Sequence, residues 1–163
     1  KAGDFPAMLE LFSRAREGLK LSEDAHLTPL PIDKAAASLS AILLDESYYD
    51  FLKSMVREVG GIPVLGEAAI IPFKARAWLD LTRQREEGGN VDEKNIRKHR
   101  NDVARLLQLL SQEARYELPS SVADDMRSFV EQATAEADYD PRQFKVNMTR
   151  DDVATRLRAA YQL

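Results

Sequence analysis

The sequence predicts an α+β protein in which a small N-terminal sheet is followed by a mostly helical C-terminal bundle. Two observations lead to this prediction. Three extended segments with alternating or continuous apolar residues occur in the first 45 residues. Beyond them, apolar residues recur at helical spacing, and glycines and prolines divide the pattern into separate helices. The chain therefore divides into a sheet portion (1–45), a helical portion (46–136) and a linker with a C-terminal helix (137–163).

Three segments of the sheet portion have the pattern of strands. Residues 5–14 alternate between two faces, and Glu10 falls between two large apolar neighbours. Residues 27–33 are extended and contain two prolines, which places them at a sheet edge or a strand end. Residues 38–45 predict a buried strand, with a short helix as the alternative.

The helical pattern predicts five helices. They cover residues 45–59, about 67–87, about 92–111, a segment that starts at 118–121, and 148–163. The first is expected to bury Val59 and to end at Gly60 and Gly61, before a short strand or extended segment at 62–65. Asp92 is a suitable N-cap for the third helix.

The last helix carries a clear start signal. Thr149 and Asp152 have the spacing of a capping box, and Met148 and Val153 have that of a hydrophobic staple. The preceding segment, residues 137–143, has the composition of a linker. The chain shows no internal repeat and no low-complexity tract.

Composition limits the classes of function. A net charge of −4 argues against a surface built broadly for nucleic acid, although a local basic cleft stays open. The absence of cysteine excludes disulfides, thiolate nucleophiles and cysteine-based zinc sites, and His26 and His99 lie far apart for a histidine metal site. No signal-peptide pattern opens the sequence, and no apolar run approaches the roughly 20 residues of a membrane span. We therefore expect a cytoplasmic protein.

One lysine falls on the apolar face of the second expected helix. Ile70, Ile71, Trp78 and Leu81 recur at helical spacing, and at about 100° per residue Lys74 lies at the centre of their stripe. A lysine costs free energy to bury and does not belong at the centre of a core-facing stripe. Either its stem packs on Trp78 while the ammonium reaches water, or the helix faces a cleft where the ammonium meets an anion such as a phosphate.

Two polar residues lie beside the apolar stripe of the third expected helix. The structural interpretation of His99 is a partly buried histidine with its hydrogen bonds satisfied. Asp102 forms either a plain helix pair with Lys98 or an ion pair with Lys74 or Arg76 of the neighbouring helix. In the second case Asp102 would hold a cationic side chain in place for a ligand.

Other cations have simpler interpretations. Arg76 lies four residues before Asp80, which is typical of a solvated face with pairing along the helix. Arg83 belongs to the same face, and Arg100 falls on the flank of the third helix's stripe.

Glu10 is the candidate metal ligand of the sheet portion. A glutamate in an otherwise apolar strand either faces solvent or belongs to a carboxylate cluster that binds Mg²⁺. A metal site for phosphoryl or nucleotidyl transfer needs at least two convergent carboxylates. The residues before Glu10 contain no acidic pair on a plausible strand, and no glycine-rich loop of a phosphate-binding type occurs in the chain.

Five segments resemble, in this order, the nucleotidyltransferase-like proteins related to abortive-infection toxins, a bacterial group of the DNA polymerase β nucleotidyltransferase superfamily. They are FPAMLELFSR, LTPLPID, SLSAILLD, GIPVLGEAAIIPFKARAWLDL and KNIRKHRNDVARLLQLL. The resemblance covers roughly residues 5–110, and its most specific parts are the lysine-bearing helix and the helix with KHRNDV. Residues 111–163 match no family pattern.

The resemblance implies transfer of a nucleotidyl group from an NTP to an acceptor. It makes Lys74 a phosphate contact, with Arg76 as a second nucleotide-binding residue. Asp102 would support Lys74 in the same site. Glu10 sits where the family's third acidic residue would be and is the implied Mg²⁺ ligand.

The family's N-terminal Gly-Ser motif and acidic pair are absent from this sequence. Because the first residue is Lys and not Met, we expect the C-terminal part of a longer protein in preference to a chain that has lost its catalytic half. We expect no transfer by this chain alone, and Mg²⁺ only if the longer protein supplies the acidic pair. The alternative function is a non-catalytic helical binding module for a protein or RNA partner.

Overall fold

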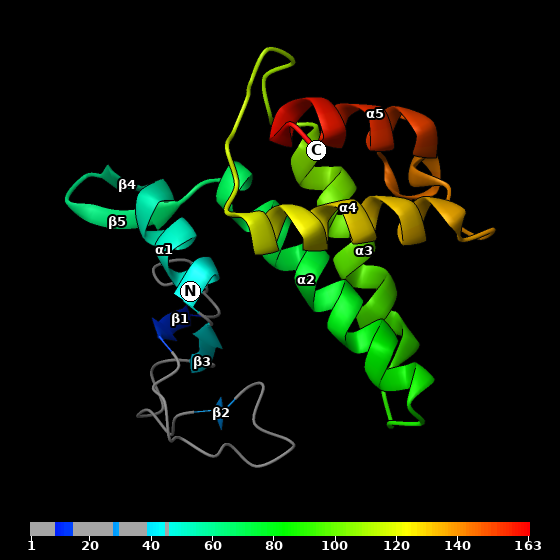
Figure 1. Cartoon of the computed structure of the whole chain (residues 1–163), viewed down its shortest axis with the longest axis horizontal. Helices are drawn as coiled ribbons and strands as arrows, with labels where there is room; N and C mark the ends of the chain where they lie inside the picture. The colour runs from blue at the N-terminus through cyan, green and yellow to red at the C-terminus, as the bar shows by residue number, and fades with distance from the viewer. Residues whose placement is uncertain (1–8, 15–27, 30–38, 45) are drawn as a thin grey trace, which may run out of the picture. The chain divides into compact units, whose positions relative to one another are not determined.

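The computed structural model describes residues 9–14, 28–29, 39–44 and 46–163, with side-chain environments from Glu46 onward (Figure 1). These residues fall in two compact units, 1–50 and 51–163. The elements are β1 (Leu9–Arg14), β2 (Thr28–Pro29), β3 (Leu39–Leu44), α1 (Glu46–Met55), β4 (Val56–Val59), β5 (Ile62–Leu65), α2 (Glu67–Glu86), α3 (Glu93–Leu107), α4 (Ser120–Ala135), η1 (Pro141–Phe144, a 3₁₀ helix) and α5 (Arg150–Tyr161). The fold class is α+β, as predicted, with a small sheet before a helical bundle.

The sheet of the first unit contains the three predicted strands. Its order is β1-β3-β2, with β1 parallel and β2 antiparallel to β3. Glu10 of β1 lies opposite Ser40 of β3. Residues 38–45, for which the sequence allowed either a strand or a short helix, therefore contain a strand, β3. Glu10 lies on a strand, as expected, but its side chain lies outside the described part of the structure.

The helix expected at 45–59 is too long, and its C-terminal end is wrong. It stops at Met55, and Val56–Val59 form β4, which pairs with β5 in an antiparallel hairpin. Gly60 and Gly61 have φ values of 59° and 79°, the left-handed backbone that a two-residue type I′ hairpin turn requires. The two glycines therefore turn a hairpin and do not end a helix. Val59, expected to be buried, is 62 % exposed.

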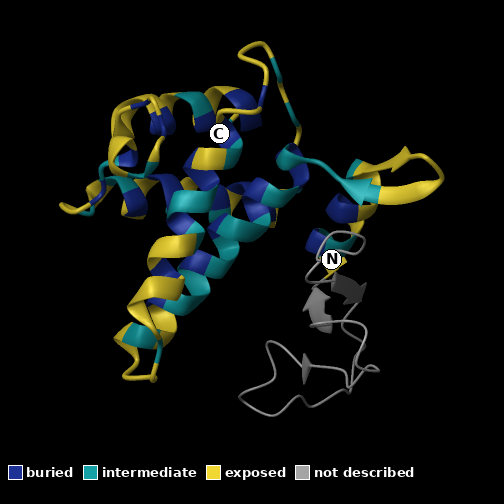
Figure 2. Cartoon of the chain, turned by 180° about the vertical axis from the view of Figure 1, so that it is seen from behind, coloured by how far each residue is buried: buried dark blue, intermediate teal, exposed yellow. Residues whose placement is uncertain are grey.

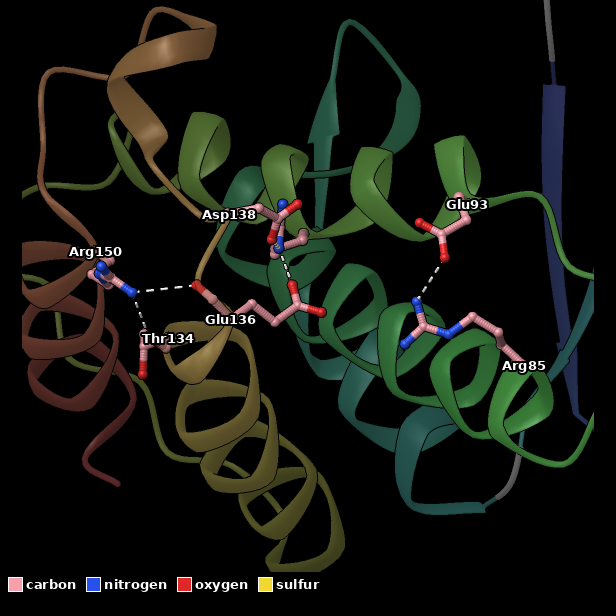
Figure 3. A network of polar contacts seen from close by, with 7 residues as sticks. Arg85, Glu93, Thr134, Glu136, Asp138 and Arg150 are labelled. Carbon is pink, nitrogen blue, oxygen red and sulfur yellow. Dashed lines mark hydrogen bonds and ion pairs between the residues drawn. The ribbon is translucent and has the colours of Figure 1, made fainter.

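The second unit is a helical bundle built on α2 and α3. A short connection makes these two helices antiparallel neighbours, and an ion pair between Arg85 and Glu93 (3.1 Å) joins their ends (Figure 3). α4 packs on α2, and α5 packs on α4 and α3 (Figure 1). The buried faces of these helices meet in one core (Figure 2). Its largest fully buried side chains include Trp78, Phe129, Ile71, Leu107, Met126, Leu157 and Tyr161.

A proline lies inside α2 without ending it. Pro72 is the sixth residue of this helix and has no N–H to donate to the carbonyl of Ala68, four residues earlier. The hydroxyl of Tyr161, in α5, donates to that carbonyl oxygen instead, at 2.9 Å in a buried position. The tyrosine thus satisfies the acceptor that the proline leaves unpaired, and it ties the last helix to the start of α2.

The start signals of the helices are confirmed. The side chain of Asp92 accepts a hydrogen bond from the backbone N–H of Lys94 at the start of α3. Thr149 and Asp152 form the full capping box of α5. α3 ends at Leu107, four residues before its expected end. Within the described part of the chain, no helix combines the length and the apolar character that a membrane crossing requires.

The segment interpreted as a linker, 137–143, is packed against the bundle. Tyr139 and Pro141 are buried, and Pro141 opens η1. Arg150 of α5 donates to the carbonyl oxygens of Thr134 and Glu136 at the end of α4 (Figure 3). The residues that follow α4 are therefore held by the bundle, and α5 packs on helices of its own chain.

Candidate functional site

The buried face of α2 is not centred on Lys74. The buried face contains alanines and a threonine as well as large apolar residues. The buried residues of α2 are Ala68, Ala69, Ile71, Pro72, Ala75, Trp78 and Thr82. At about 100° per residue Lys74 lies roughly 100° from the centre of this face. Its side chain is 24 % exposed, so it stands at the edge of the core and not within it.

Lys74 faces α3, where it meets Asp102. The Lys74 Nζ and Asp102 Oδ2 atoms are 3.9 Å apart, and the Asp102 side chain is 21 % exposed. Of the two alternatives for Asp102, the structure therefore has the ion pair between the helices, with Lys74. Asp102 Oδ1 also accepts a hydrogen bond from Arg105 Nη1 at 3.1 Å. One carboxylate thus holds two cations in a partly covered position.

His99 completes this cluster on the side of the core. Burial lowers its pKa to about 4, and the positive charge of Lys74 acts in the same direction, while Asp102 opposes it. The imidazole is therefore neutral at pH 7. Its position is the partly buried one expected, but its Nδ1 is buried without a hydrogen-bond partner among the described residues. A neutral ring adds no charge beside Lys74.

The depressed pKa of His99 predicts acid sensitivity. The unfolded chain binds a proton on this ring below pH 6.5, whereas the folded chain does so only near pH 4. The free energy of unfolding should therefore fall by about 1 kcal/mol between about pH 7 and pH 5, after allowance for solvent screening. Urea unfolding of His99→Gln should lack this part of the fall. His26→Gln is the matched control, and an equal effect of both variants would contradict the assignment.

Arg76 does not join Lys74. The two residues are two positions apart, so their side chains leave α2 in nearly opposite directions. Arg76 pairs with Asp80 at 2.9 Å, as expected, and with Asp125 of α4 at 2.7 Å. Burial acts to lower its pKa, but the hydrogen bonds to both carboxylates outweigh burial and raise it. Arg76 therefore links α2 to α4, away from the Lys74 cluster.

The family resemblance assigns Glu10 and Lys74 to one nucleotide site. Glu10 belongs to the first unit and Lys74 to the second, and the side chain of Glu10 lies outside the described part of the structure. The common site of these two residues stays a prediction.

The buried cation of the bundle is Arg100, which the sequence analysis placed only on a flank. Its side chain is 4 % exposed and pairs with Glu136 and, at 3.1 Å, with Asp138, both from the segment after α4 (Figure 3). Its guanidinium carbon lies 4.6 Å from the centre of the Tyr139 ring. The signal that would have found it is the acidic and aromatic run EADYD, whose charges need a cation once Tyr139 is buried.

The described side chains do not make a magnesium site. Among residues 46–163 no three histidine, aspartate or glutamate side chains lie close enough together to hold a metal ion. Asp102, the nearest carboxylate to Lys74, already carries two cations. These donors do not fit Mg²⁺, which prefers several carboxylate or carbonyl oxygens around one position.

Two shallow clefts of the described bundle are lined by residues other than Lys74. One is lined by Leu107, Leu110, Ser111, Gln112, Arg156, Ala159 and Ala160, and the other by Arg105, Gln143, Phe144 and Lys145. The cleft expected over Lys74 is thus not one of these two. The second begins at Arg105, which shares Asp102 with Lys74.

Comparison of the chain with protein-family models, with curated proteins and with solved structures found no match.

Proposed function

We propose that this chain is the C-terminal part of a nucleotidyltransferase-like protein, which transfers a nucleotidyl group from an NTP to an acceptor. In this proposal Lys74 contacts the phosphates of the NTP. The observation that carries it is the ion pair between Lys74 and Asp102, at 3.9 Å. This pair joins the two segments on which the family resemblance is most specific, now α2 and α3.

The geometry of the pair leaves Lys74 able to bind an anion. At 3.9 Å the ammonium and the carboxylate attract each other, but they are too far apart for a hydrogen bond. Lys74 therefore keeps its three N–H donors for a ligand. Asp102 also neutralises part of the charge of Arg105, and His99 is uncharged, so the cluster of Lys74, Arg105 and Asp102 has a net positive charge. A phosphate group complements this arrangement.

Each residue has a defined task in this proposal. Lys74 donates to phosphate oxygens, and partial cover from solvent strengthens that interaction. Asp102 is a positioning residue, because it limits the directions that the flexible lysine side chain takes. Transfer itself requires carboxylates that the described residues do not supply, so the chain alone is expected to bind the nucleotide without turning it over. Glu10 stays the proposed third carboxylate of the complete protein, where bound Mg²⁺ would neutralise charge on the phosphates.

Calorimetry with NTPs and Mg²⁺ tests the phosphate contact. The chain should bind an NTP, and Lys74→Ala should weaken binding roughly tenfold or more, since a hydrogen bond to a charged group contributes about 1.5–3 kcal/mol. Arg83→Ala, an exposed cation on the same helix, is the matched control and should bind as the parent chain does. Equal loss in both variants, or no binding by the parent chain, would contradict the proposal.

Asp102→Asn tests whether Asp102 orients the Lys74 side chain or acts only through its negative charge. The substitution removes a negative charge next to the expected phosphate, so a purely electrostatic effect would tighten binding. If Asp102 orients Lys74, the same variant should bind the NTP more weakly although the site has become more positive. Tighter binding by Asp102→Asn would rule out the positioning role. Thermal melts of each variant confirm that the bundle is intact.

A further inference from the structure

All the charged residues on the outward face of α3 are cations. On a helical wheel, Lys94, Arg97, Lys98 and Arg105 fall within an arc of about 100°, opposite the buried residues Ile96, Val103 and Leu107. All four cations are exposed. Asn101 is the remaining residue of the arc, and no carboxylate falls inside it. The helix as a whole has five cationic and two acidic side chains in a chain whose net charge is −4.

Most of these cations have no carboxylate of their own. Within the described part of the chain, no direct ion pair forms at Lys94, Arg97 or Lys98, although, next to the hydrogen bond from Arg100, the charge of Arg97 helps to lower the pKa of Asp138. Arg105 shares Asp102 with Lys74. An ordinary solvated helix face mixes the two signs at spacings of three and four residues, which stabilises the helix. The face of α3 lacks this mixture, so its cations repel one another until an anionic partner covers them.

The arc leads into the cleft at the C-terminal end of α3. This open cleft, of about 560 Å³, is lined by Arg105, Gln143, Phe144 and Lys145. The guanidinium carbon of Arg105 lies 5.4 Å from the centre of the half-buried Phe144 ring. Lys145 has a φ of 69°, a left-handed conformation that is uncommon for a lysine. The cleft thus adds an aromatic ring, an amide and a further cation to the basic face.

We propose that this basic face, comprising Lys94, Arg97, Lys98, Arg105 and Lys145 with Phe144, binds single-stranded RNA. In single-strand sites phosphates follow a track of cations, and bases stack on aromatic rings or on arginine guanidinium planes. The Phe144 ring already stacks on Tyr139, with centroids 6.2 Å apart, and carries the exposed guanidinium of Arg105, on which a base would stack. From Lys94 to Arg105 the track is about 16 Å long at 1.5 Å per residue, which spans several nucleotides. The proposal does not rest on the proposed NTP site.

One feature selects RNA over DNA. Gln143 offers both a donor and an acceptor in the cleft, which suits the 2′-hydroxyl that distinguishes RNA from DNA.

Fluorescence anisotropy with a labelled oligouridylate of about 12 nucleotides tests the proposal on the full chain. With five cations on the strand, log K should fall with log salt with a slope of about −3.5. Affinity should therefore drop about a hundredfold between about 50 mM and 200 mM salt. The triple variant Lys94→Gln, Arg97→Gln, Lys98→Gln should reduce the slope to about −1.4 and weaken binding at low salt more than tenfold.

The matched control removes the same number of positive charges from other helices. Arg83→Gln, Arg127→Gln, Arg158→Gln removes three exposed cations from α2, α4 and α5 and should retain most of the binding. Phe144→Leu should weaken binding about fivefold or more, because it removes the ring that supports the Arg105 guanidinium for base stacking, with a slope like that of the parent chain. Equal loss in the two triple variants overturns the proposal, as does an oligothymidylate or a duplex that binds as tightly as the oligouridylate. Lys74→Ala should leave RNA binding nearly unchanged, which separates this surface from the NTP site.

Discussion

Replacement of Arg100 by methionine is expected to lower the free energy of unfolding of the helical bundle by about 2–3 kcal/mol. Arg100 is buried on α3 and compensates two carboxylates, Glu136 and Asp138, while its guanidinium lies over the ring of Tyr139. Breaking a buried ion pair by removing one partner usually costs about 3–5 kcal/mol. We expect a smaller loss here, because both carboxylates are partly exposed and water can solvate them once Arg100 is gone. The melting temperature should fall by about 5–10 °C.

Trp78 provides a specific readout for this variant. It is the single tryptophan of the chain and is buried in the bundle, so its fluorescence follows unfolding of the second unit. Arg97→Met, an exposed cation three residues earlier on α3, is the control and should change the stability by no more than about 0.5 kcal/mol. Similar losses in the two variants would show that charge on α3, and not the buried contacts of Arg100, determines the effect.

The same variant has a second consequence at Asp138. The hydrogen bond from Arg100 lowers the pKa of this carboxyl below its usual 3.8, so the pair stabilises the folded chain above that pH and the stabilisation is lost as the pH falls further. In Arg100→Met the pKa of Asp138 should return toward its usual value. Titration by NMR measures this change. An unchanged pKa would mean that Arg100 does not hold Asp138 in solution.

The role of Arg100 shows why part of the bundle was not predictable from local patterns. Helical spacing placed this residue on the flank of an apolar stripe and left its partners unknown, because they lie 36 and 38 residues further along the chain. Residues 137–143 have a polar composition that is typical of a linker. What packs this segment is a pair of long-range contacts, the cation–π contact at Tyr139 and the ion pairs of Arg100. Neither produces a periodic signal.

The strand β4 was missed for a related reason. Val59 continues the helical spacing of the residues before it, so the pattern favoured a helix up to the glycines. A glycine pair ends a helix or turns a hairpin with equal ease, since both uses need a positive φ. Pairing of Val56–Val59 with Ile62–Leu65 decides between them. The starts of α3 and α5, in contrast, were predictable, because capping depends on residues that are neighbours in the sequence.

The position of Lys74 illustrates the limits of counting large apolar residues. Ile70 and Leu81 moved the expected centre of the α2 stripe toward α3, whereas the true buried face also uses Ala75 and Thr82. Small residues mark the closest approach of two helices, but they stand out little in a hydropathy pattern. The pairing of Lys74 with Asp102 was nevertheless predictable, since the adjacent flanks of two neighbouring helices face each other.

The contact between Tyr161 and α2 leads to a second large effect on stability. Tyr161→Phe removes the hydroxyl that donates to the Ala68 carbonyl oxygen and leaves this buried acceptor without a partner. We expect a loss of about 1–3 kcal/mol in the free energy of unfolding. Tyr116→Phe is the matched control, because the Tyr116 ring lies beside that of Tyr161 but is partly exposed. This control should stay within about 0.5 kcal/mol of the parent chain.

Pro72 makes the cause of that loss testable, because Pro72→Ala restores the backbone N–H that normally donates to the carbonyl of Ala68. If Tyr161 compensates for the proline, Tyr161→Phe should cost about 1 kcal/mol less in the Pro72→Ala background than in the parent chain. Urea unfolding of the parent, the two single variants and the double variant measures this coupling. Equal costs in both backgrounds would mean that the Tyr161 hydroxyl stabilises α5 independently of Pro72. A reduced cost would show that the last helix of the chain is what allows a proline within α2, the helix that carries Lys74.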